Sequence, residues 1–352
     1  MRFHASATAI GLILSSGLLL SACSSDGEQT AAPTTVRLLA HDSFVVSQSL
    51  IDQFEADTGI TLQITTGGDA GSMVAGAVLA AGSPSADVMF GIDNTLLSKA
   101  VDADVFSAYS SPDASQLLTS LQTDTADGLV TPVDYGDVCV NIDDTWFAEH
   151  HIAAPINIDQ LKDAKYKDLL VVEDPASSSP GLAFMLATIA KYGDSWTKYW
   201  ERLNANGVKV SGSWTDAYES VFSAGKGDRP LVVSYATSPP AEIVYAEAPK
   251  PSKPSTSVLT QGCYRQIEFA GVLRGTQNQE AAQKVVDWLI SAPVQADVPL
   301  SMFVFPARKG VPLPDVFTKF AAQVADPLQL PAADVSANLN EWLKQWGQVM
   351  GR

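Results

Sequence analysis

VRLLAHDSFVVSQSLIDQFEADTGITLQITTGG, residues 36–68, is the stretch that decides the fold class. Its first nine residues are typical of a strand, and its last nine form a second strand that ends in glycines. Between them, Leu50, Ile51 and Phe54 share one face of a helix predicted over 48–58. Strand, helix and strand in this order predict a βαβ unit, and therefore an α/β protein with a largely parallel sheet.

The same alternation continues along the chain, and two extended runs interrupt it. LVTPVDYGDVCVNID at 129–143 and GCYRQIEFAGVLRG at 262–275 are both rich in strand-forming residues. We interpret the first as a crossing from one lobe to a second, and the other as the return. The remaining elements that the pattern predicts are helices at 73–81, 181–192, 278–291 and 338–350, and strands at 86–92 and 169–172.

The N-terminus has the features of an export signal. Arg2 and His4 precede the apolar run AIGLILSSGLLL, which has the length of a signal-peptide core and is too short for a permanent membrane span. The run ends in LSAC, which looks like the lipobox of a bacterial lipoprotein. We therefore expect a signal peptide over 1–22, lipidation of Cys23, and a flexible polar tether over 23–35. Ordinary secretory cleavage with Cys23 incidental is the alternative.

Charge limits the classes of partner. The chain has 39 acidic and 22 basic residues among 352, which gives a formal charge of −17. Such acidity argues against nucleic acid, or an anionic membrane surface, as the main partner. A small cationic ligand suits this composition better.

Two cysteines, Cys139 and Cys263, remain in the predicted exported body. An oxidising compartment permits a disulfide between them. Both also lie in apolar, strand-like contexts, which suit two separate buried thiols equally well. The local pattern leaves these alternatives open.

Two turns are candidates for a ligand site. Asp93 and Asn94 follow an apolar strand directly, where they can cap a helix beginning at Thr95 or meet a ligand at the strand end. A run of three serines precedes Pro180 at the start of another predicted helix. Free backbone N–H groups and hydroxyls there suit an anion or a phosphate, and a capping turn alone is the alternative. The serines are Ser177, Ser178 and Ser179.

Signals for catalysis, cofactors and metals are missing from the sequence. It contains no glycine-rich phosphate loop, no zinc-like ligand spacing and no glycine-flanked nucleophile elbow around a serine. His150 and His151 are adjacent, so they cannot both face one site from regular structure, and we interpret them as solvated. A secreted hydrolase that uses Ser178 or Asp93 is the alternative from another class. We predict no catalytic residue and no cofactor.

From about residue 36 to its end, the chain resembles the thiamine-binding substrate-binding proteins of bacterial ABC importers. The resemblance implies their two-lobed type II periplasmic-binding-protein fold with two crossing hinge strands. It rests on the order and spacing of several motifs over nearly the whole predicted body. These motifs are HDSF (41–44), ADVMFGIDNTLL (86–97), VDYGDVCVN (133–141), EDPASSSPGL (173–182), SWTDAY (213–218) and VSYATSPP (233–240).

The resemblance also implies a ligand set. In this family the Asp–Asn turn lies at the edge of the ligand cleft, so Asp93 and Asn94 are expected to line the cleft as well as cap a helix. A thiazolium carries a fixed positive charge that aromatic faces attract, and an aminopyrimidine can hydrogen-bond a carboxylate. The serine turn could hold the phosphate of a thiamine ester. Carried over by position, the other family contacts are Asp69, Ser177, Ser178, Ser179, Trp214 and Tyr235.

This chain departs from the family at two aromatic positions. His41 stands where relatives commonly have Tyr, and Phe303 stands at the position of the family's Trp. The expected cage is smaller, and a protonated His41 would repel a thiazolium. Thiamine, a phosphorylated form and a related cationic heteroaromatic therefore all stay open as ligands. The alternatives to a ligand role are that Trp214 is an exposed loop residue and that Tyr235 is a core residue.

The remaining expectations follow from the family. Lobe 1 is expected at 36–132 and 266–308, and lobe 2 at 133–265 and 309–352. Because the crossing strands run close together in this fold, the resemblance implies a Cys139–Cys263 disulfide. The implied partner is an ABC permease with its ATPase subunit, outside the cytoplasm, with the lipid anchor on the outer face of the cell membrane or in the periplasm. A ferric-ion or oxyanion receptor of the same fold is the alternative.

Overall fold

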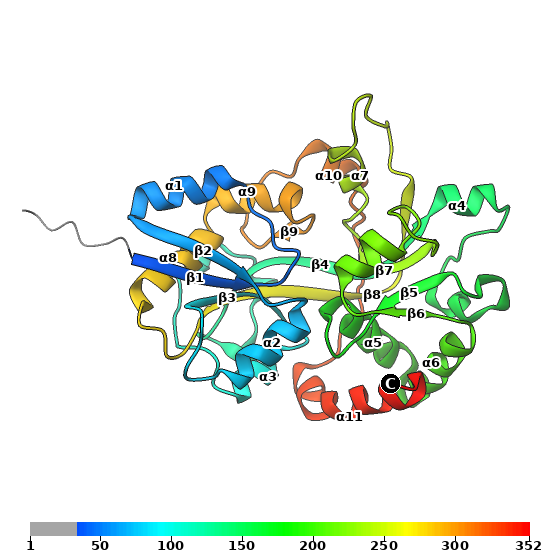
Figure 1. Cartoon of the computed structure of the whole chain (residues 1–352), viewed down its shortest axis with the longest axis horizontal. Coiled ribbons are helices and arrows are strands. Elements are labelled where there is room, and N and C mark those ends of the chain that lie inside the picture. Colours follow the sequence, from blue (N-terminus) through cyan, green and yellow to red (C-terminus); the bar gives the residue numbers. More distant parts are fainter. Residues whose placement is uncertain (1–33) are drawn as a thin grey trace, which may run out of the picture. The chain divides into compact units, whose positions relative to one another are not determined.

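The structure, a computed structural model, describes residues 34–352 apart from the side chain of residue 124. These residues form an α/β protein with a nine-stranded sheet, as predicted (Figure 1). The strands are β1 (Thr34–Ala40), β2 (Ile60–Thr66), β3 (Val88–Asp93), β4 (Thr131–Asp143), β5 (Leu170–Glu173), β6 (Lys209–Ser211), β7 (Leu231–Tyr235), β8 (Thr256–Val272) and β9 (Phe305–Pro306).

The α-helices follow the strands in the alternation that the sequence predicts. They are α1 (Gln48–Thr58), α2 (Ala70–Leu79), α3 (Leu97–Asp102), α4 (Asp144–Glu149), α5 (Ser179–Tyr192), α6 (Trp196–Ala205), α7 (Pro240–Val244), α8 (Gln279–Leu289), α9 (Ala292–Ser301), α10 (Asp315–Phe320) and α11 (Ala332–Met350). A π-helical turn, η7, covers Asp216–Val221, and several short 3₁₀ turns complete the connections.

The strand order is β2-β1-β3-β8-β4-β7-β5-β6, with β9 paired to β4. Strands β1, β2 and β3 pair parallel, and so do β5, β6 and β7. The expectation of a largely parallel sheet is wrong at the centre, where the β3–β8, β8–β4 and β4–β7 pairs are antiparallel. The reason is that β4 and β8 run through the middle of the sheet in opposite directions, joining its two parallel parts (Figure 1).

Helix α1 shows why the local prediction succeeds. It spans the predicted residues, with Phe54 buried and Leu50 and Ile51 packed beside the core. Gly59 ends it in the left-handed conformation, at φ 67°, and donates its N–H to the Glu55 carbonyl. An apolar stripe and a glycine stop are both local signals, so both are visible in the sequence.

Other predicted boundaries differ by a few residues. Helix α2 begins at Ala70 instead of residue 73, because Asp69 caps it. Helix α11 begins at Ala332 instead of residue 338, directly after Pro331. Its Trp346 is only 2 % exposed and meets the ring of Trp200 edge-on at 5.6 Å. This tryptophan therefore serves packing.

The two crossing strands are linked covalently. Cys139 of β4 and Cys263 of β8 form a disulfide in the structure, with Cα atoms 4.4 Å apart, and both are buried. They lie where the β4–β8 register shifts, between the Val138 and Val140 pairings. The disulfide therefore joins the strands at an irregular point of their ladder.

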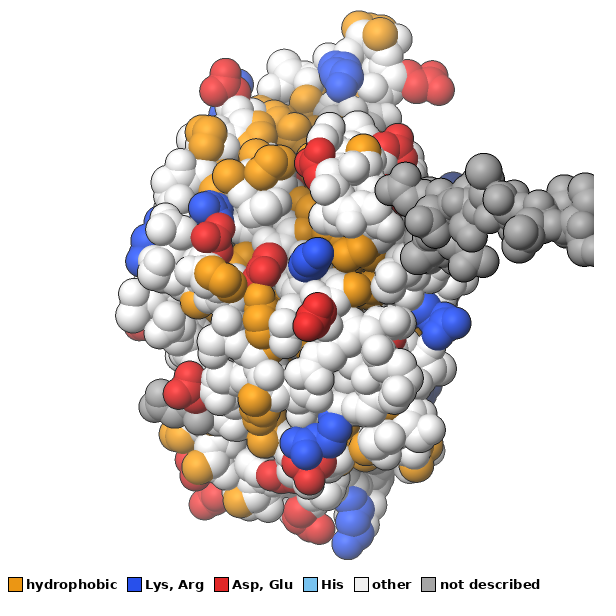
Figure 2. Space-filling view, turned by 90° about the vertical axis from the view of Figure 1, so that its left-hand side faces the viewer, with side chains coloured by type: hydrophobic (Ala, Val, Ile, Leu, Met, Phe, Trp, Pro, Cys, Tyr) orange, Lys and Arg blue, Asp and Glu red, His pale blue; other side chains and the backbone are white. Residues whose placement is uncertain are grey.

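The N-terminal predictions lie outside the described residues, namely the signal peptide over 1–22 and the lipidated Cys23. The predicted tether is two residues too long, because Thr34 and Thr35 already belong to β1. None of the helices within residues 34–352 has the length and apolarity needed to cross a membrane. On the face that Figure 2 shows, acidic and basic side chains are interspersed among apolar patches, without a patch of one sign.

Candidate functional site

The candidate site gathers at the carboxyl ends of the parallel strands. His41 follows β1, Asp69 follows β2 after two glycines, and Asp93 ends β3. On the other parallel part, Glu173 ends β5 and Tyr235 ends β7. Ligands in open α/β sheets bind at this edge, so the topology brings residues from both parts of the chain to the same region.

Asp69 connects the two parts directly. It caps α2 by accepting the Ala70 N–H at 2.6 Å, and its other oxygen accepts the Trp214 N–H at 2.8 Å. The residue is 7 % exposed. Burial raises the pKa of its carboxyl, and the hydrogen bond from Trp214 opposes that rise. This carboxylate therefore fixes the loop that carries Trp214 against the start of α2.

The three serines have three different roles. Ser177 donates its hydroxyl to the Gly212 carbonyl at 2.7 Å, and Ser179 accepts Gln266 Nε2 at 2.9 Å. The hydroxyl of Ser178 is buried and has no hydrogen-bond partner among the described residues. The structure thus leaves Ser178, alone of the three, with an unsatisfied hydroxyl.

Backbone contacts hold α2 against the serine turn. The Ser72 N–H donates to the Ser177 carbonyl at 3.1 Å. A Cβ on Gly71 would lie 2.6 Å from the carbonyl carbon and oxygen of Ser177. Only glycine permits this approach, because neither the helix backbone nor the turn backbone can move aside cheaply.

Trp214 and Tyr235, both expected as ligand contacts, lie near one another in the structure. Their ring centroids are 6.4 Å apart, at 65° to one another. Trp214 also stacks on Tyr218 at 5.1 Å and donates its indole N–H to Ser234 Oγ at 2.9 Å. Both Trp214 and Tyr235 are half-buried, so neither is a fully exposed loop residue nor a fully buried core residue.

Phe303 does not join this pair. It adopts φ 54°, an uncommon conformation for a residue with a side chain, and its ring meets Tyr245 at 5.5 Å. Among the described residues no ring contact connects Phe303 with Trp214 or Tyr235. In this conformation, Trp214 and Tyr235 are the two of these three residues that can form the expected aromatic cage.

The two residues of the Asp–Asn turn, Asp93 and Asn94, bind different parts of the backbone. Asp93 is fully buried, and one of its oxygens accepts both the N–H and the hydroxyl of Thr95. Asn94 uses both polar atoms of its side chain on β8, donating to the Arg265 carbonyl and accepting the Ile267 N–H. The helix begins at Leu97, two residues later than predicted. Asp93 binds the backbone of the turn that precedes the helix, whose own N-cap is Leu96 without a side-chain hydrogen bond, and Asn94 positions β3 against β8.

Four buried carboxyl groups lie close enough to Tyr235 for their charges to act on its hydroxyl. Burial is the first cause of a raised Tyr235 pKa, and the charges of Glu268, Asp69, Asp93 and Asp134 add to it. Burial also raises the pKa of Asp93 to about 7, and that of Asp134 well above its usual range. One oxygen of Asp93 and both oxygens of Asp134 have no hydrogen-bond partner among the described residues.

Glu173 adds a fifth buried carboxyl. The residue has no exposed surface, and neither of its oxygens is hydrogen-bonded within the described part of the chain. Burial raises its pKa well above the usual range, and the charge of Asp69 raises it further. So many buried acids without cationic partners make this region a strong candidate for a positively charged ligand.

His41 is the basic group nearest to these acids. Its Nε2 lies 3.6 Å from Glu268 Oε1, and its Nδ1 lies 2.9 Å from Ser43 Oγ. Burial alone would lower the His41 pKa, but the Glu268 carboxylate overrides that effect and the pKa is raised. A Cβ on Gly91 would lie 2.2 Å from the imidazole Cδ2, so the glycine makes room for this ring.

Sequence reasoning misses several members of the site, although four of them lie inside the motifs that carry the family resemblance. The missed residues are Asp134, Glu173, Tyr218, Ser234, Gln266 and Glu268. The available signal is a charged side chain inside a strand that is otherwise buried, as in β4, β5 and β8. His150 and His151, in contrast, are exposed as predicted, with His150 stacked on Trp146.

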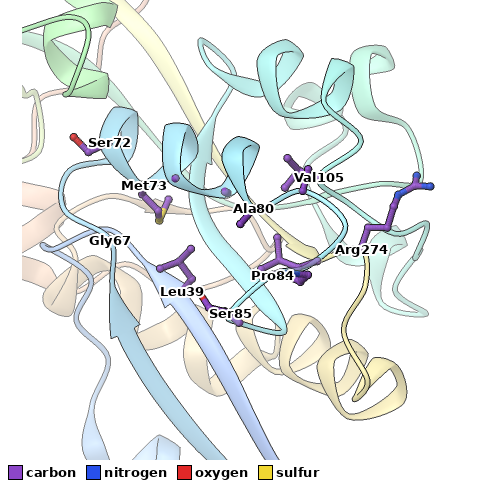
Figure 3. Close-up of a pocket in the computed structure, with 14 residues that line it drawn as sticks. Leu39, Gly67, Ser72, Met73, Ala80, Pro84, Ser85, Val105 and Arg274 are labelled. Atoms are coloured by element: carbon purple, nitrogen blue, oxygen red, sulfur yellow. The ribbon is translucent and has the colours of Figure 1, made fainter.

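The described residues contain a cavity of about 220 Å³ beside α2 (Figure 3). Leu39, Met73 and Val105 line it, together with Arg274. None of the strand-end acids and none of the ten predicted ligand residues lines this cavity. Within residues 34–352, no group of three or more His, Cys, Asp or Glu side chains has the arrangement of a metal site.

Comparison with known proteins agrees with this geometry. Residues 42–296 match the family model of the bacterial extracellular solute-binding proteins. The chain is 28% identical over 300 residues to the thiamine-binding periplasmic protein of Escherichia coli K12, covering 85% of this chain and 87% of that protein. The Salmonella typhimurium protein of the same name is 26% identical over 326 residues, covering 91% and 95%.

A solved structure gives the same result. The periplasmic thiamin binding protein superposes with a TM-score of 0.80 at 25% identity, covering 90% of this chain and 96% of that one. This likeness confirms the predicted two-lobed type II periplasmic-binding-protein fold. The match of the family model over most of the chain, together with a fold that places its acids and aromatic rings at the strand ends, shows that the chain belongs to the bacterial extracellular solute-binding proteins.

Proposed function

We propose that this protein binds thiamine, or a phosphate ester of it, and delivers it to an ABC permease with its ATPase subunit. The observation that carries the proposal is the set of buried carboxyl groups around the Trp214–Tyr235 pair. A thiazolium supplies the missing positive charge, and the aromatic faces attract the same cation. The names of the relatives support the same ligand.

The ligand site that we propose consists of residues from both lobes. The lobes are proposed at 36–132 with 266–308, and at 133–265 with 309–352. Capture then takes place by closure about the crossing strands, without any bond being made or broken. The proposed ligand contacts are His41, Asp69, Asp93, Ser178, Trp214 and Tyr235, with Ser177 and Ser179 positioning the turn and Phe303 at the periphery.

The phosphate group has weaker support than the cation. The backbone N–H groups of Ser177 and Ser178 already donate to the Asp174 carbonyl, and that of Ser179 points to Asp69 at 3.4 Å. Few donors remain beside the Ser178 hydroxyl, and Glu173 and Asp69 add negative charge nearby. Free thiamine is therefore our first ligand, and its monophosphate the second.

A ferric ion is the second candidate, and one observation argues against it. The tyrosine that it would need beside Tyr235 is Tyr135, whose ring instead stacks on Phe305 at 5.2 Å with Arg265 over it. An oxyanion is disfavoured by the buried acids themselves.

Calorimetric titration of the purified protein with thiamine, thiamine monophosphate, ferric citrate and inorganic phosphate tests the proposal. We expect thiamine to bind with a dissociation constant well below millimolar, and tighter than the other three. Binding of ferric ion alone, or of neither thiamine compound below millimolar, would overturn it.

We also propose that the protein is exported and held to the membrane by a lipid on Cys23. The sequence around this cysteine supports the proposal. Cys23→Ser should move the full-length protein from the membrane fraction to the released fraction. An unchanged distribution would exclude the anchor without touching the ligand assignment.

A further inference from the structure

Three acids lie side by side across the middle of the sheet. In the strand register Glu268 of β8 pairs with Asp93 of β3 on one side and with Asp134 of β4 on the other. Their exposed fractions are 6 %, 0 % and 1 %. Like charges placed directly opposite one another destabilise a sheet, and burial increases the penalty. The fold thus keeps a row of acids that its own stability disfavours.

Glu268 is the member of this row that faces a cation. Its Oε1 lies 3.6 Å from His41 Nε2, and both side chains are 8 % exposed. His41 Nε2 has no hydrogen-bond partner among the described residues, so this nitrogen is buried, polar and aimed at the acids. Ser43 Oγ holds the other ring nitrogen, at 2.9 Å.

The charged groups that act on the His41 ring are all carboxylates. Glu268 lies on β8, Asp69 caps α2, and Asp42 follows in the same loop. Asp134 of β4 pairs with Glu268 in the strand register, and Coulomb repulsion between the two carboxylates favours a nearby cation. An imidazolium here has the charge, and approximately the ring size, of a thiazolium.

Resting on the proposed function, we propose that Glu268 is the residue that makes the site selective for a positively charged ligand, and that His41 occupies the position beside it until the ligand binds. The ligand cation then replaces the histidine cation as the partner of the acid row. His41 is a positioning residue in this scheme, and Glu268 sets the specificity.

The first test compares two ligands of one shape and different charge. Thiamine carries the thiazolium, and its thiophene isostere lacks the charge. Glu268→Gln should weaken thiamine binding by about 30-fold or more, the effect of removing one member of a buried charge pair. It should change the affinity for the thiophene isostere less than about twofold. Glu201→Gln, an exposed site within α6, is the matched control and should change neither.

A second variant keeps the proposal testable if Glu268→Gln fails to fold. His41→Gln removes the internal cation, so it should bind thiamine more tightly than the wild type at pH 6, and the difference should shrink as the pH rises and His41 of the wild type loses its proton. An equal loss for both ligands in Glu268→Gln, or an unchanged pH dependence in His41→Gln, would overturn the selectivity role while thiamine binding by the wild type stands. A wild type that binds neither compound would overturn the proposed function, and this inference with it.

Discussion

Trp214 is held on two sides, by Tyr218 stacked on its ring and by the bond from its indole N–H to Ser234. Because it is half-buried, its truncation should remove a ligand face without emptying the core. Trp214→Ala should weaken thiamine binding by roughly 1–3 kcal/mol, a factor of about 5–150. Calorimetric titration measures the loss, and a thermal melt without ligand checks the fold.

Trp146→Ala is the matched control for this change. Trp146 is also half-buried and also stacks on a ring, that of His150 at 3.8 Å. It lies on α4, which contributes none of the proposed ligand contacts. Equal effects of the two substitutions on binding would contradict a ligand role for Trp214.

Single residues also show which part of the site the sequence could predict. Asp69, Trp214 and Tyr235 are located from the sequence alone, because the family resemblance carries them over by position. Asp134 and Glu268 are 134 positions apart in the numbering, and the resemblance assigns a ligand role to neither. Only the β4–β8 register makes them neighbours. A sequence pattern describes neighbours along the chain, so it cannot predict which residues of β4 and β8 lie opposite one another in the sheet.

At the scale of secondary-structure elements, the buried acids of the strands predict that thiamine binding depends on pH. Burial raises the pKa of Asp93 to about 7 and raises the pKa values of Asp134 and Glu173 well above their usual range, so protonation of these groups is favoured without ligand. A bound cation favours their ionised forms. Thiamine binding should therefore release protons and tighten as the pH rises from about 6 to 8.

Titration at pH 7 in phosphate and in Tris buffer measures the release, because the two buffers differ in ionisation enthalpy. The stability of the ligand-free protein changes with pH in the opposite direction to ligand binding. Because the folded pKa values of these acids lie above the unfolded ones, the acids stabilise the ligand-free protein below about pH 4 and lose that contribution as the pH rises through 7. The thermal shift caused by thiamine should therefore grow from pH 5.5 to pH 8. A shift that shrinks over this range would contradict the role of the acids.

The contact between α2 and the serine turn gives another prediction. Gly71→Ala places a methyl group 2.6 Å from backbone atoms of Ser177, so the contact must open. Overpacking of this kind costs about 1–3 kcal/mol of stability. We also expect weaker thiamine binding, because the two sides of the site that this contact joins move apart. Gly76→Ala is the control on the same helix, because a Cβ there meets nothing within 4 Å. A loss in Gly76→Ala as large as in Gly71→Ala would show that helix α2, and not the contact, is responsible.

Element boundaries follow a similar division. Helix α1 is predicted to the residue because its stripe and its Gly59 stop are local. Helix α2 is predicted three residues late, because its start depends on Asp69, a side chain that also binds Trp214 far along the chain. Local signals locate helices well where the cap serves only the helix.

For the whole molecule, the disulfide between Cys139 and Cys263 should be a major source of stability. It closes a loop with a sequence separation of 124. The chain-entropy model gives roughly 4–5 kcal/mol for a loop of this size, often less in practice. The double variant Cys139→Ala with Cys263→Ala should therefore unfold at clearly lower denaturant concentration. Free-thiol titration of the unfolded, unreduced wild type should find neither cysteine free, and two free thiols would contradict the bridge.

The sequence predicts the two-lobed α/β class for the whole molecule, but not the direction of every strand. Short strands such as β5 and β7 alternate with helices and pair parallel, as the pattern implies. Strands β4 and β8 are long runs whose partners lie on either side of the sheet. Their antiparallel pairing depends on where the chain crosses, which composition does not encode.

The backbone contact of Gly71 and Ser72 with Ser177 also limits what the protein can enclose. It is formed by main-chain atoms, so neither pH nor side-chain rotation adjusts its length. This contact fixes the spacing between the start of α2 and the serine turn. The contact is already formed in the structure, so a solute held between these two sides has to fit the spacing that the contact sets.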